Sequence, residues 1–280
     1  MKEFNPEYLK KVANDIRKGA VTAVYKAKSG HPGGSLSISD VLAYLYFCEM
    51  NVNPNNPKDP DRDRFVLSKG HTAPALYATL ALKGYFGTDE LLKLRQLNAM
   101  LQGHPDMKHI PGVDMTTGSL GQGISAACGM ALSAKISNKN YNVYAVLGDG
   151  EIQEGQVWEA FMFANHYKLS NLCAFIDNNN LQIDGPVDEV MSPYPIDEKL
   201  KAFGFNVIVI DAHSLEEIKN AVEAFKAEKD RPTAIIMKSV KGKGVSFMEN
   251  NVSWHGAAPN EEQYNIAMAD LEKIAKELEA

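Results

Sequence analysis

The fold is decided by the stretch VYAVLGDG at residues 143–150. Its first five residues form a short, continuous apolar run, which is typical of a strand buried on both faces of a parallel sheet. The Gly-Asp-Gly sequence that follows ends the strand at Asp149. Ligands of open parallel sheets bind beyond the carboxyl ends of the strands, so Asp149 is placed to meet a ligand.

Further apolar runs predict three more strands of the same kind, at residues 172–176, 207–210 and 234–237. Helical patterns at residues 157–166 and 215–225 separate them, which is the alternation expected of βαβ units. Other helices are predicted at residues 8–29, 40–46, 72–82 and 124–134 and from residue 261 onward. The sequence GHPGG at residues 30–34 is expected to end the first helix and to stay non-helical, because of its proline and glycines. We therefore predict a single α/β domain, residues 1–280, in which helices cover both faces of a mostly parallel sheet.

The composition narrows the class of protein. With 45% hydrophobic and 23% charged residues in a chain of 280, the disordered, collagen-like and coiled-coil classes are excluded. The net charge of −6 argues against nucleic acid or an anionic membrane surface as the main partner. The sequence shows no signal peptide and no run long enough to span a bilayer, so we expect a cytoplasmic protein. Three cysteines without a C-x-x-C pair are expected to be reduced thiols used in packing.

The next predicted strand supplies a second half of the site. Residues 172–176 are followed by DNNNLQIDG, which places Asn179 thirty positions after Asp149, about one βα unit. Gly150 would let the backbone approach a phosphate closely. The carboxylate of Asp149 would repel that phosphate unless a cation lay between them. An aspartate, an asparagine amide oxygen and a main-chain carbonyl near Leu181 would leave an octahedral Mg²⁺ with room for two diphosphate oxygens and a water. The sequence thus predicts a diphosphate clamp.

Gly-Asp-Gly at one strand end and Asn-Asn about one βα unit later is the pattern of thiamine-diphosphate enzymes. Five other motifs resemble those of transketolases and occur in the family's order: GHPGGSLS at 30–37, SKGH at 68–71, GHPD at 103–106, TTGSLGQG at 116–123 and WHG at 254–256. The resemblance covers nearly the whole chain, but only the amino-terminal, diphosphate-binding half of a transketolase. It implies a thiamine-diphosphate-binding fold and the amino-terminal subunit of a split transketolase. The pyrimidine-binding and carboxy-terminal domains would lie on a partner chain, in an α₂β₂ heterotetramer.

The resemblance also implies the roles of individual residues. Asp149, Asn179 and the carbonyl of Leu181 would hold Mg²⁺, for which Ca²⁺ or Mn²⁺ could substitute. The cofactor contacts would be His71, Thr117, Gly118, Leu120, Gly150, Glu154, Asn179, Ile183 and His255. Among them, Gly150 and His255 would touch the diphosphate, Ile183 would pack near the thiazolium, and Leu120 would lie by the aminopyrimidine. Glu154 resembles the glutamate that links two active sites through the subunit interface.

Four histidines would be catalytic, contacting substrate hydroxyls or shuttling protons: His31, His71, His104 and His255. Histidine suits proton transfer because its ordinary pKa lies near neutral pH, while the cofactor carries the bond-breaking chemistry. The implied reaction moves a two-carbon ketol unit between phosphorylated ketose and aldose sugars. The glutamate that ionises the cofactor in this family lies outside this sequence, so we expect the chain alone to be inactive.

Two alternatives stay open on the sequence. The chain could belong to another thiamine-diphosphate enzyme, acting on a 2-oxo acid or an unusual sugar. It could also be a non-catalytic binding or regulatory protein that keeps the clamp. The sequence around Lys238, Lys241 and Lys243 could approach the diphosphate or a partner, but a solvated basic loop is the favoured interpretation.

Overall fold

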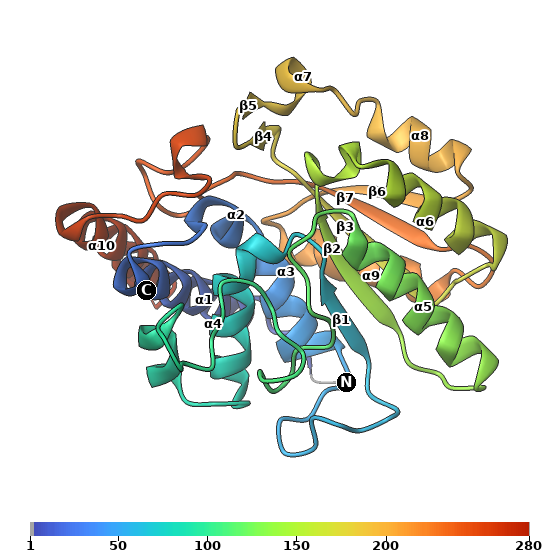
Figure 1. The fold of residues 1–280 in the computed structure, drawn as a ribbon, viewed down its shortest axis with the longest axis horizontal. Coiled ribbons are helices and arrows are strands. Elements are labelled where there is room, and N and C mark those ends of the chain that lie inside the picture. The colour runs from blue at the N-terminus through green and yellow to red at the C-terminus, as the bar shows by residue number, and fades with distance from the viewer. Residues whose placement is uncertain (1–2, 280) are drawn as a thin grey trace.

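The computed structural model describes residues 3–279, and its core is one parallel sheet (Figure 1). Within these residues five strands form the sheet in the order β1-β2-β3-β7-β6, and every neighbouring pair is parallel. The strands are β1 (Arg64–Leu67), β2 (Val143–Gly148), β3 (Leu172–Asn178), β6 (Asn206–Asp211) and β7 (Thr233–Lys238). The predicted α/β class and the four predicted strands are confirmed.

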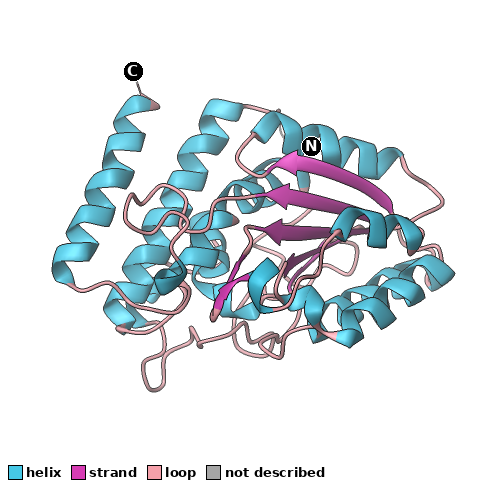
Figure 2. Ribbon diagram, turned by 90° about the horizontal axis from the view of Figure 1, so that it is seen from above, coloured by secondary structure: helices cyan, strands magenta, loops and turns pink. Residues whose placement is uncertain are grey.

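Helices cover both faces of the sheet, as the view from above makes plain (Figure 2). On one face lie α5 (Gln122–Ile136), α6 (Gly155–His166) and α8 (Ile196–Ala202). On the other lie α1 (Pro6–Ala27), α3 (Ser39–Tyr44), α4 (Ala73–Lys83) and α9 (Leu215–Ala227). The shorter elements include α2 (Pro32–Ser37), α7 (Val187–Val190), and a hairpin of β4 (Leu181–Gln182) and β5 (Gly185–Pro186). Apolar side chains of both layers pack on β2 and β3, which are buried along almost their whole length.

The strand order creates a crevice at the carboxyl edge of the sheet. The chain runs from β1 through β2 and β3 to β6 in one direction, then reverses to insert β7 beside β3. Because such crossovers are right-handed, the reversal moves α9 to the face opposite α6 and α8. The segments that follow β3 and β7 therefore diverge, which is the arrangement that places a ligand at a topological switch point.

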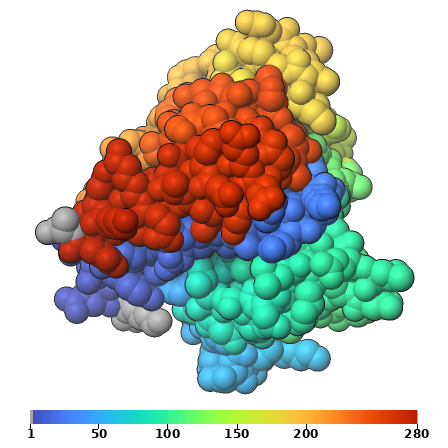
Figure 3. Space-filling view, turned by 90° about the vertical axis from the view of Figure 1, so that its left-hand side faces the viewer, coloured from blue at the N-terminus to red at the C-terminus, as the bar shows by residue number. Residues whose placement is uncertain are grey.

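The chain after β7 returns to the amino-terminal helix. Its last helix, α10 (Glu261–Glu277), packs along α1, where Asn14 donates a hydrogen bond to the carbonyl of Leu271 at 2.8 Å. In the space-filling view the red carboxy-terminal segment and the blue amino-terminal segment form adjoining parts of one face (Figure 3). This packing holds the loop between β7 and α10 against the cavity described below.

The structure corrects the prediction that residues 30–34 stay non-helical. Lys28, with a φ of 51°, ends α1, but Pro32 then begins α2. Proline is favoured at the first position of a helix, where its missing N–H has no partner to lose. The helix predicted at residues 40–46 begins at Ser39 in the structure, and Ile38 is the residue before it. The Asp40 carboxylate does not cap this helix, because it is held by Arg17 and His213.

Within residues 3–279 no helix has the length and apolar character that a membrane span requires. Cys128 and Cys173 are buried and Cys48 is partly buried, and none of these three is in a disulfide. The thiols therefore occupy the packing positions that the sequence predicts.

Candidate active site

A cavity of about 340 Å³ opens at the carboxyl ends of β2 and β3. It brings together segments that lie far apart in the sequence, from the turn before α2 to the loop before α10. The residues that line it are His31, Gly34, Lys69, His71, Gly118, Leu120, Gly148, Asp149, Gly150, Glu151, Gln153, Glu154, Asn179, Leu181, Gln182, Ile183, Lys241 and His255. All the predicted site residues are among them except Thr117 and His104.

Asp149 directly follows β2 and is almost completely buried. Its carboxylate accepts hydrogen bonds from the main-chain N–H of Asn180 at 2.6 Å and from Nδ2 of Asn178 at 3.2 Å. Burial, followed by the nearby charge of Asp177, raises the pKa of Asp149 above its ordinary value. A cation at this carboxylate would stabilise the charged form that burial disfavours.

The turn after β3 holds the other two predicted metal ligands next to Asp149. Asn180 has a φ of 59°, a left-handed conformation that asparagine tolerates, and it reverses the chain between Asn179 and Leu181. Oδ1 of Asn179 accepts the N–H of Leu181 at 3.0 Å. Among residues 3–279 no cluster of three or more His, Cys, Asp or Glu side chains suits a metal, so a cation here would depend on amide and carbonyl oxygens beside one carboxylate.

Three of the four predicted histidines form a cluster on the cavity wall. The rings of His71 and His255 are stacked with centroids 5.2 Å apart, and His31 meets their edges at 5.2 and 5.7 Å. Burial lowers the pKa of His31 to about 4 and that of His255 to about 3, and it also lowers the pKa of His71. The rings are therefore neutral near pH 7, so each can accept a proton and donate one.

His104 and Thr117 lie just behind the wall. A Cβ atom added at Gly118, which has a φ of +145°, would lie 3.1 Å from the His104 ring, so this ring packs directly on the Gly118 backbone. The hydroxyl of Thr117 is buried beside Gly70. Both residues support the turn that Gly118 and Leu120 present to the cavity.

Lys241 is a cavity residue that the sequence interpretation missed. We predicted a solvated basic loop, but Lys241 is only 3% exposed. Its Nζ donates to the carbonyl of Leu181 at 2.6 Å and lies 2.9 Å from Nδ1 of His255. Burial lowers its pKa to about 8. Its position three residues after β7 was the available signal, because that strand ends at the same edge of the sheet as β2 and β3.

Lys69 and Glu151 were also missed by the sequence interpretation. Lys69, from the SKGH motif, forms a buried ion pair with Asp177. Glu151 is buried and accepts hydrogen bonds from Ser68 Oγ at 2.5 Å and from the N–H groups of Gly121 and Gly148. The carboxylates of Asp177 and Glu151 thus connect the turns around the cavity through hydrogen bonds and an ion pair.

The cavity has features that fit a diphosphate-bearing cofactor. Within the described residues three buried side-chain atoms have no hydrogen-bond partner, and two of them, His31 Nδ1 and Thr117 Oγ1, lie at or beside this cavity. Leaving such groups unpaired is costly, so partners supplied by a ligand would stabilise the site. A Cβ atom added at Gly150 would lie 3.1 Å from Oε1 of Gln182, so a side chain here would crowd Gln182. Lysine nitrogens, an aspartate and an asparagine turn complete a set suited to a diphosphate with its cation.

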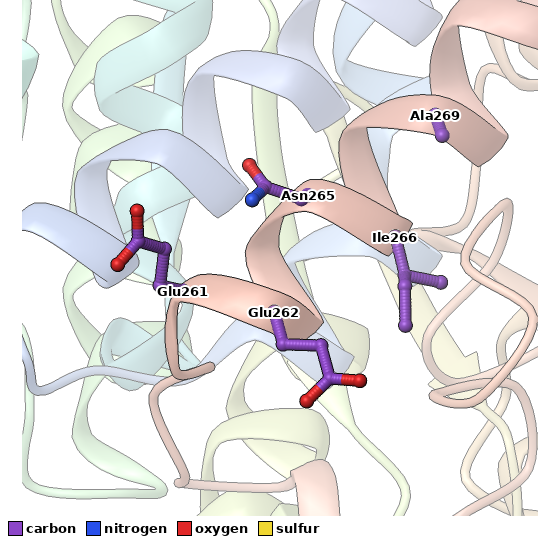
Figure 4. A pocket seen from close by; sticks show the side chains of 5 residues that line it. All are labelled: Glu261, Glu262, Asn265, Ile266 and Ala269. Atoms are coloured by element: carbon purple, nitrogen blue, oxygen red, sulfur yellow. The ribbon is translucent and has the colours of Figure 1, made fainter.

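A larger hollow, of about 660 Å³, lies along α10 (Figure 4). It is lined by Glu261, Glu262, Asn265, Ile266 and Ala269. The carboxylates of Glu261 and Glu262 point away from each other along the helix surface, so no polar groups converge there. The chemistry therefore concentrates in the smaller cavity.

Comparison with known proteins identifies the family that this chain matches. Residues 9–272 match the family model described as the transketolase thiamine-diphosphate-binding domain. The chain is 49% identical to a 6-deoxy-6-sulfo-D-fructose transketolase subunit of Clostridium sp. (strain MSTE9), over 93% of this chain and 95% of that protein. It is 43% identical to an apulose-4-phosphate transketolase subunit of Phocaeicola vulgatus, over 94% of this chain and 93% of that protein.

Longer relatives match only in part. Human transketolase is 46% identical over 89% of this chain, and the matched region is 39% of the human protein. The crystal structure of transketolase from Campylobacter jejuni superposes with a TM-score of 0.89 at 34% identity, over 98% of this chain and 47% of that one. The similarity thus spans nearly all of this chain and less than half of these longer proteins.

Proposed function

The chain belongs to the transketolase family, and from that premise we propose that it is the diphosphate-binding subunit of a two-chain transketolase. The complex transfers a two-carbon ketol unit from a phosphorylated ketose to an aldose. The observation that carries this proposal is the placement of Asp149 and the turn at residues 179–181 at one end of a cavity whose wall holds three neutral histidines.

The cation and the diphosphate bind at the strand ends. Asp149, Asn179 and the carbonyl of Leu181 hold Mg²⁺, or Ca²⁺ or Mn²⁺ in its place, because oxygen ligands of this kind suit these cations. Gly150, His255 and Lys241 contact the diphosphate. Lys241 now donates to the Leu181 carbonyl, so its ammonium lies next to the position where the negative charge of the cofactor would arrive.

Thiamine diphosphate supplies the carbanion-stabilising chemistry, and the chain supplies binding, orientation and proton transfer. Leu120 and Ile183 pack against the rings of the cofactor, with Thr117 and Gly118 beside them. His31, His71 and His255 line the cavity, where they contact substrate hydroxyls and move their protons, since neutral imidazoles can act in both directions. His104 is assigned to the same group, although its ring packs on the Gly118 backbone behind the cavity wall.

A partner chain completes the site. Leu120 and Ile183 are 40% and 66% exposed at the mouth of the cavity, although both are apolar. A second surface that covers them would bury them and exclude water from the reacting groups. We assign this surface to a chain that carries the pyrimidine-binding and carboxy-terminal domains, in an α₂β₂ assembly in which Glu154 lies at the interface.

Co-expression with a candidate partner tests the proposal. The chain, the partner and their mixture are assayed with xylulose 5-phosphate and ribose 5-phosphate, with and without thiamine diphosphate and Mg²⁺. We expect ketol transfer only when both chains and both cofactors are present. Turnover by this chain alone would refute the partner requirement, and a mixture that binds neither cofactor would refute the assignment.

Unusual sugars form the second candidate substrate class. Two relatives that match over nearly their whole length are named for 6-deoxy-6-sulfo-D-fructose and apulose 4-phosphate. The same co-expressed complex is therefore offered both of these ketoses beside xylulose 5-phosphate. The substrate with the highest kcat/KM identifies the donor, and a 2-oxo acid in the same panel tests the remaining catalytic alternative.

A further inference from the structure

The carboxylate of Asp177 is the most highly connected buried group near the cavity, although it does not line it. It is fully buried near the end of β3. It accepts hydrogen bonds from Ser37 Oγ at 2.7 Å and from Asn179 Nδ2 at 3.1 Å, and it also binds Lys69 Nζ and Ser239 Oγ. One side chain therefore holds four donors.

These four donors come from four separate segments that each build part of the cavity. Ser37 ends α2, which follows His31, and Lys69 precedes His71 in the turn after β1. Asn179 lies in the turn after β3, and Ser239 begins the loop that carries Lys241. Ser239, Lys69 and Ser37 are separated from Asp177 by 62, 108 and 140 residues, so nothing local fixes these three segments relative to β3.

The charge of Asp177 also determines the orientation of the Asn179 side-chain amide, that is, whether Nδ2 or Oδ1 points toward Asp177. An ionised carboxylate can only accept hydrogen bonds, so it selects the NH₂ group of Asn179. The amide oxygen is then left with Leu181 N–H as its neighbour and a second lone pair for a cation. A neutral amide at position 177 could donate as well as accept, and this selection would be lost.

We propose that Asp177 is a positioning residue. Its carboxylate orients the Asn179 oxygen toward the cation and fixes the positions of the four cavity segments relative to one another. It acts through Asn179, Lys69, Ser37 and Ser239 and does not itself touch cofactor or substrate. This inference rests on the proposed function, since it assumes that a divalent cation and a diphosphate bind at residues 149 and 179–181.

The test compares Asp177→Asn with Asp114→Asn in the full chain co-expressed with its partner. Asp114 is a matched control because it is also buried, pairs with the cation of Arg62 and accepts the N–H of Phe65, but it lies at the amino end of β1. Binding of Mn²⁺ in the presence of thiamine diphosphate is followed by electron paramagnetic resonance. We expect Asp177→Asn to weaken Mn²⁺ binding by about tenfold or more, the usual effect of losing a group that orients a metal ligand.

Asp114→Asn is expected to lower thermal stability as Asp177→Asn does, but to leave Mn²⁺ binding within about twofold of the wild type, since it touches no group that orients a ligand. Ser239→Ala and Ser37→Ala each remove one donor to Asp177 and keep the test valid if Asp177→Asn does not fold. Each should weaken Mn²⁺ binding by about threefold, a smaller loss than that of the carboxylate itself.

Two outcomes separate this inference from the function on which it rests. If the wild type binds Mn²⁺ with thiamine diphosphate and the Asp177 and serine variants bind it equally well, Asp177 is only a structural residue and the inference is overturned. If the wild-type complex with the partner itself binds no Mn²⁺ with the cofactor, the proposed cation site is refuted and the inference falls with it.

Discussion

Burial sets the charge of the groups around the cavity before any ligand binds. It raises the pKa of Asp149 and lowers the pKa values of His31, His71 and His255, so each of these groups is driven toward its neutral form. A divalent cation at Asp149 would reverse this preference there, and a diphosphate would complement the ammonium of Lys241. The site is therefore most stable when it is filled by a pair of opposite charges.

Asp149→Asn separates metal binding from folding. The variant should bind Mg²⁺ with thiamine diphosphate about tenfold or more weakly, because the one charged ligand in the proposed set is lost. Its free energy of unfolding without ligands should stay within about 1 kcal/mol of the wild type, since burial already opposes the charged carboxylate. Isothermal titration calorimetry and urea unfolding measure the two quantities.

Asp188→Asn is the control for this variant. Asp188 is an exposed carboxylate that accepts a hydrogen bond from Asn180 Nδ2 at 2.9 Å, on the other side of the same turn. It should leave Mg²⁺ binding unchanged. Equal Mg²⁺ affinity of Asp149→Asn and the wild type would remove Asp149 from the site.

His31 makes the stability of the chain depend on pH. Burial and the charge of Arg95 lower its pKa to about 4, below the ordinary 6.5. The unfolded chain therefore takes up this proton first, and stability is lost as the pH falls from about 6.5 toward 4. His31→Gln should reduce the loss of unfolding free energy between pH 7 and pH 5, as measured by urea unfolding at both values.

His166→Gln provides the comparison, because this histidine is exposed at the end of α6. It should reproduce the wild-type difference between the two pH values. An unchanged pH profile in His31→Gln would show that burial of this ring does not oppose its charge.

At the scale of elements, the sequence predictions were confirmed for strands that a short local pattern is enough to identify. The apolar runs of β2 and β3 predict the sheet, and the polar residues directly after them include Asp149 and Asn179, which line one cavity. The position of Lys241 was not predicted because it depends on the insertion of β7 between β3 and β6. No local sequence pattern indicates the order of strands in a sheet. Asp177 was overlooked for the same reason, since three of its four partners lie in distant segments.

The turn before α5 depends on a glycine at position 118. Its φ of +145° and the His104 ring leave no room for a side chain. Gly118→Ala should therefore destabilise the chain by about 1 kcal/mol or more and weaken cofactor binding, because the turn that carries Leu120 must shift. Urea unfolding and calorimetric titration with thiamine diphosphate and Mg²⁺ give the two readouts.

Gly129→Ala in α5 is the matched glycine substitution. A Cβ atom there meets nothing within 4 Å, and the backbone is helical. It should stabilise the isolated chain by about 0.5 to 1 kcal/mol, since alanine loses less backbone entropy than glycine on forming a helix. If both glycine variants behave alike, the special backbone of Gly118 has no effect on stability.

At the scale of the whole molecule, the surface around the cavity exposes apolar side chains. The cavity mouth exposes Leu120 and Ile183, and α6 begins directly after Glu154 at the same mouth. Along α6, Phe163 is 37% exposed, and its ring lies 4.5 Å from that of Tyr167, which is also exposed. Apolar groups that extend from a cavity mouth along one helix are what a second chain covering the cavity would bury.

Phe163→Glu tests whether α6 meets the partner. The substitution adds a charge to an exposed position, so the melting temperature of the chain alone should change little. In the mixture with the partner, a buried charge without a counter-ion should reduce complex formation and ketol transfer about tenfold or more, measured by size-exclusion chromatography and by the coupled assay. Leu97→Glu, at a position that is 92% exposed and outside α6, should assemble and turn over as the wild type does. If Phe163→Glu assembles normally, the partner binds another face, because a glutamate that stays exposed to solvent does not weaken an interface that lies elsewhere.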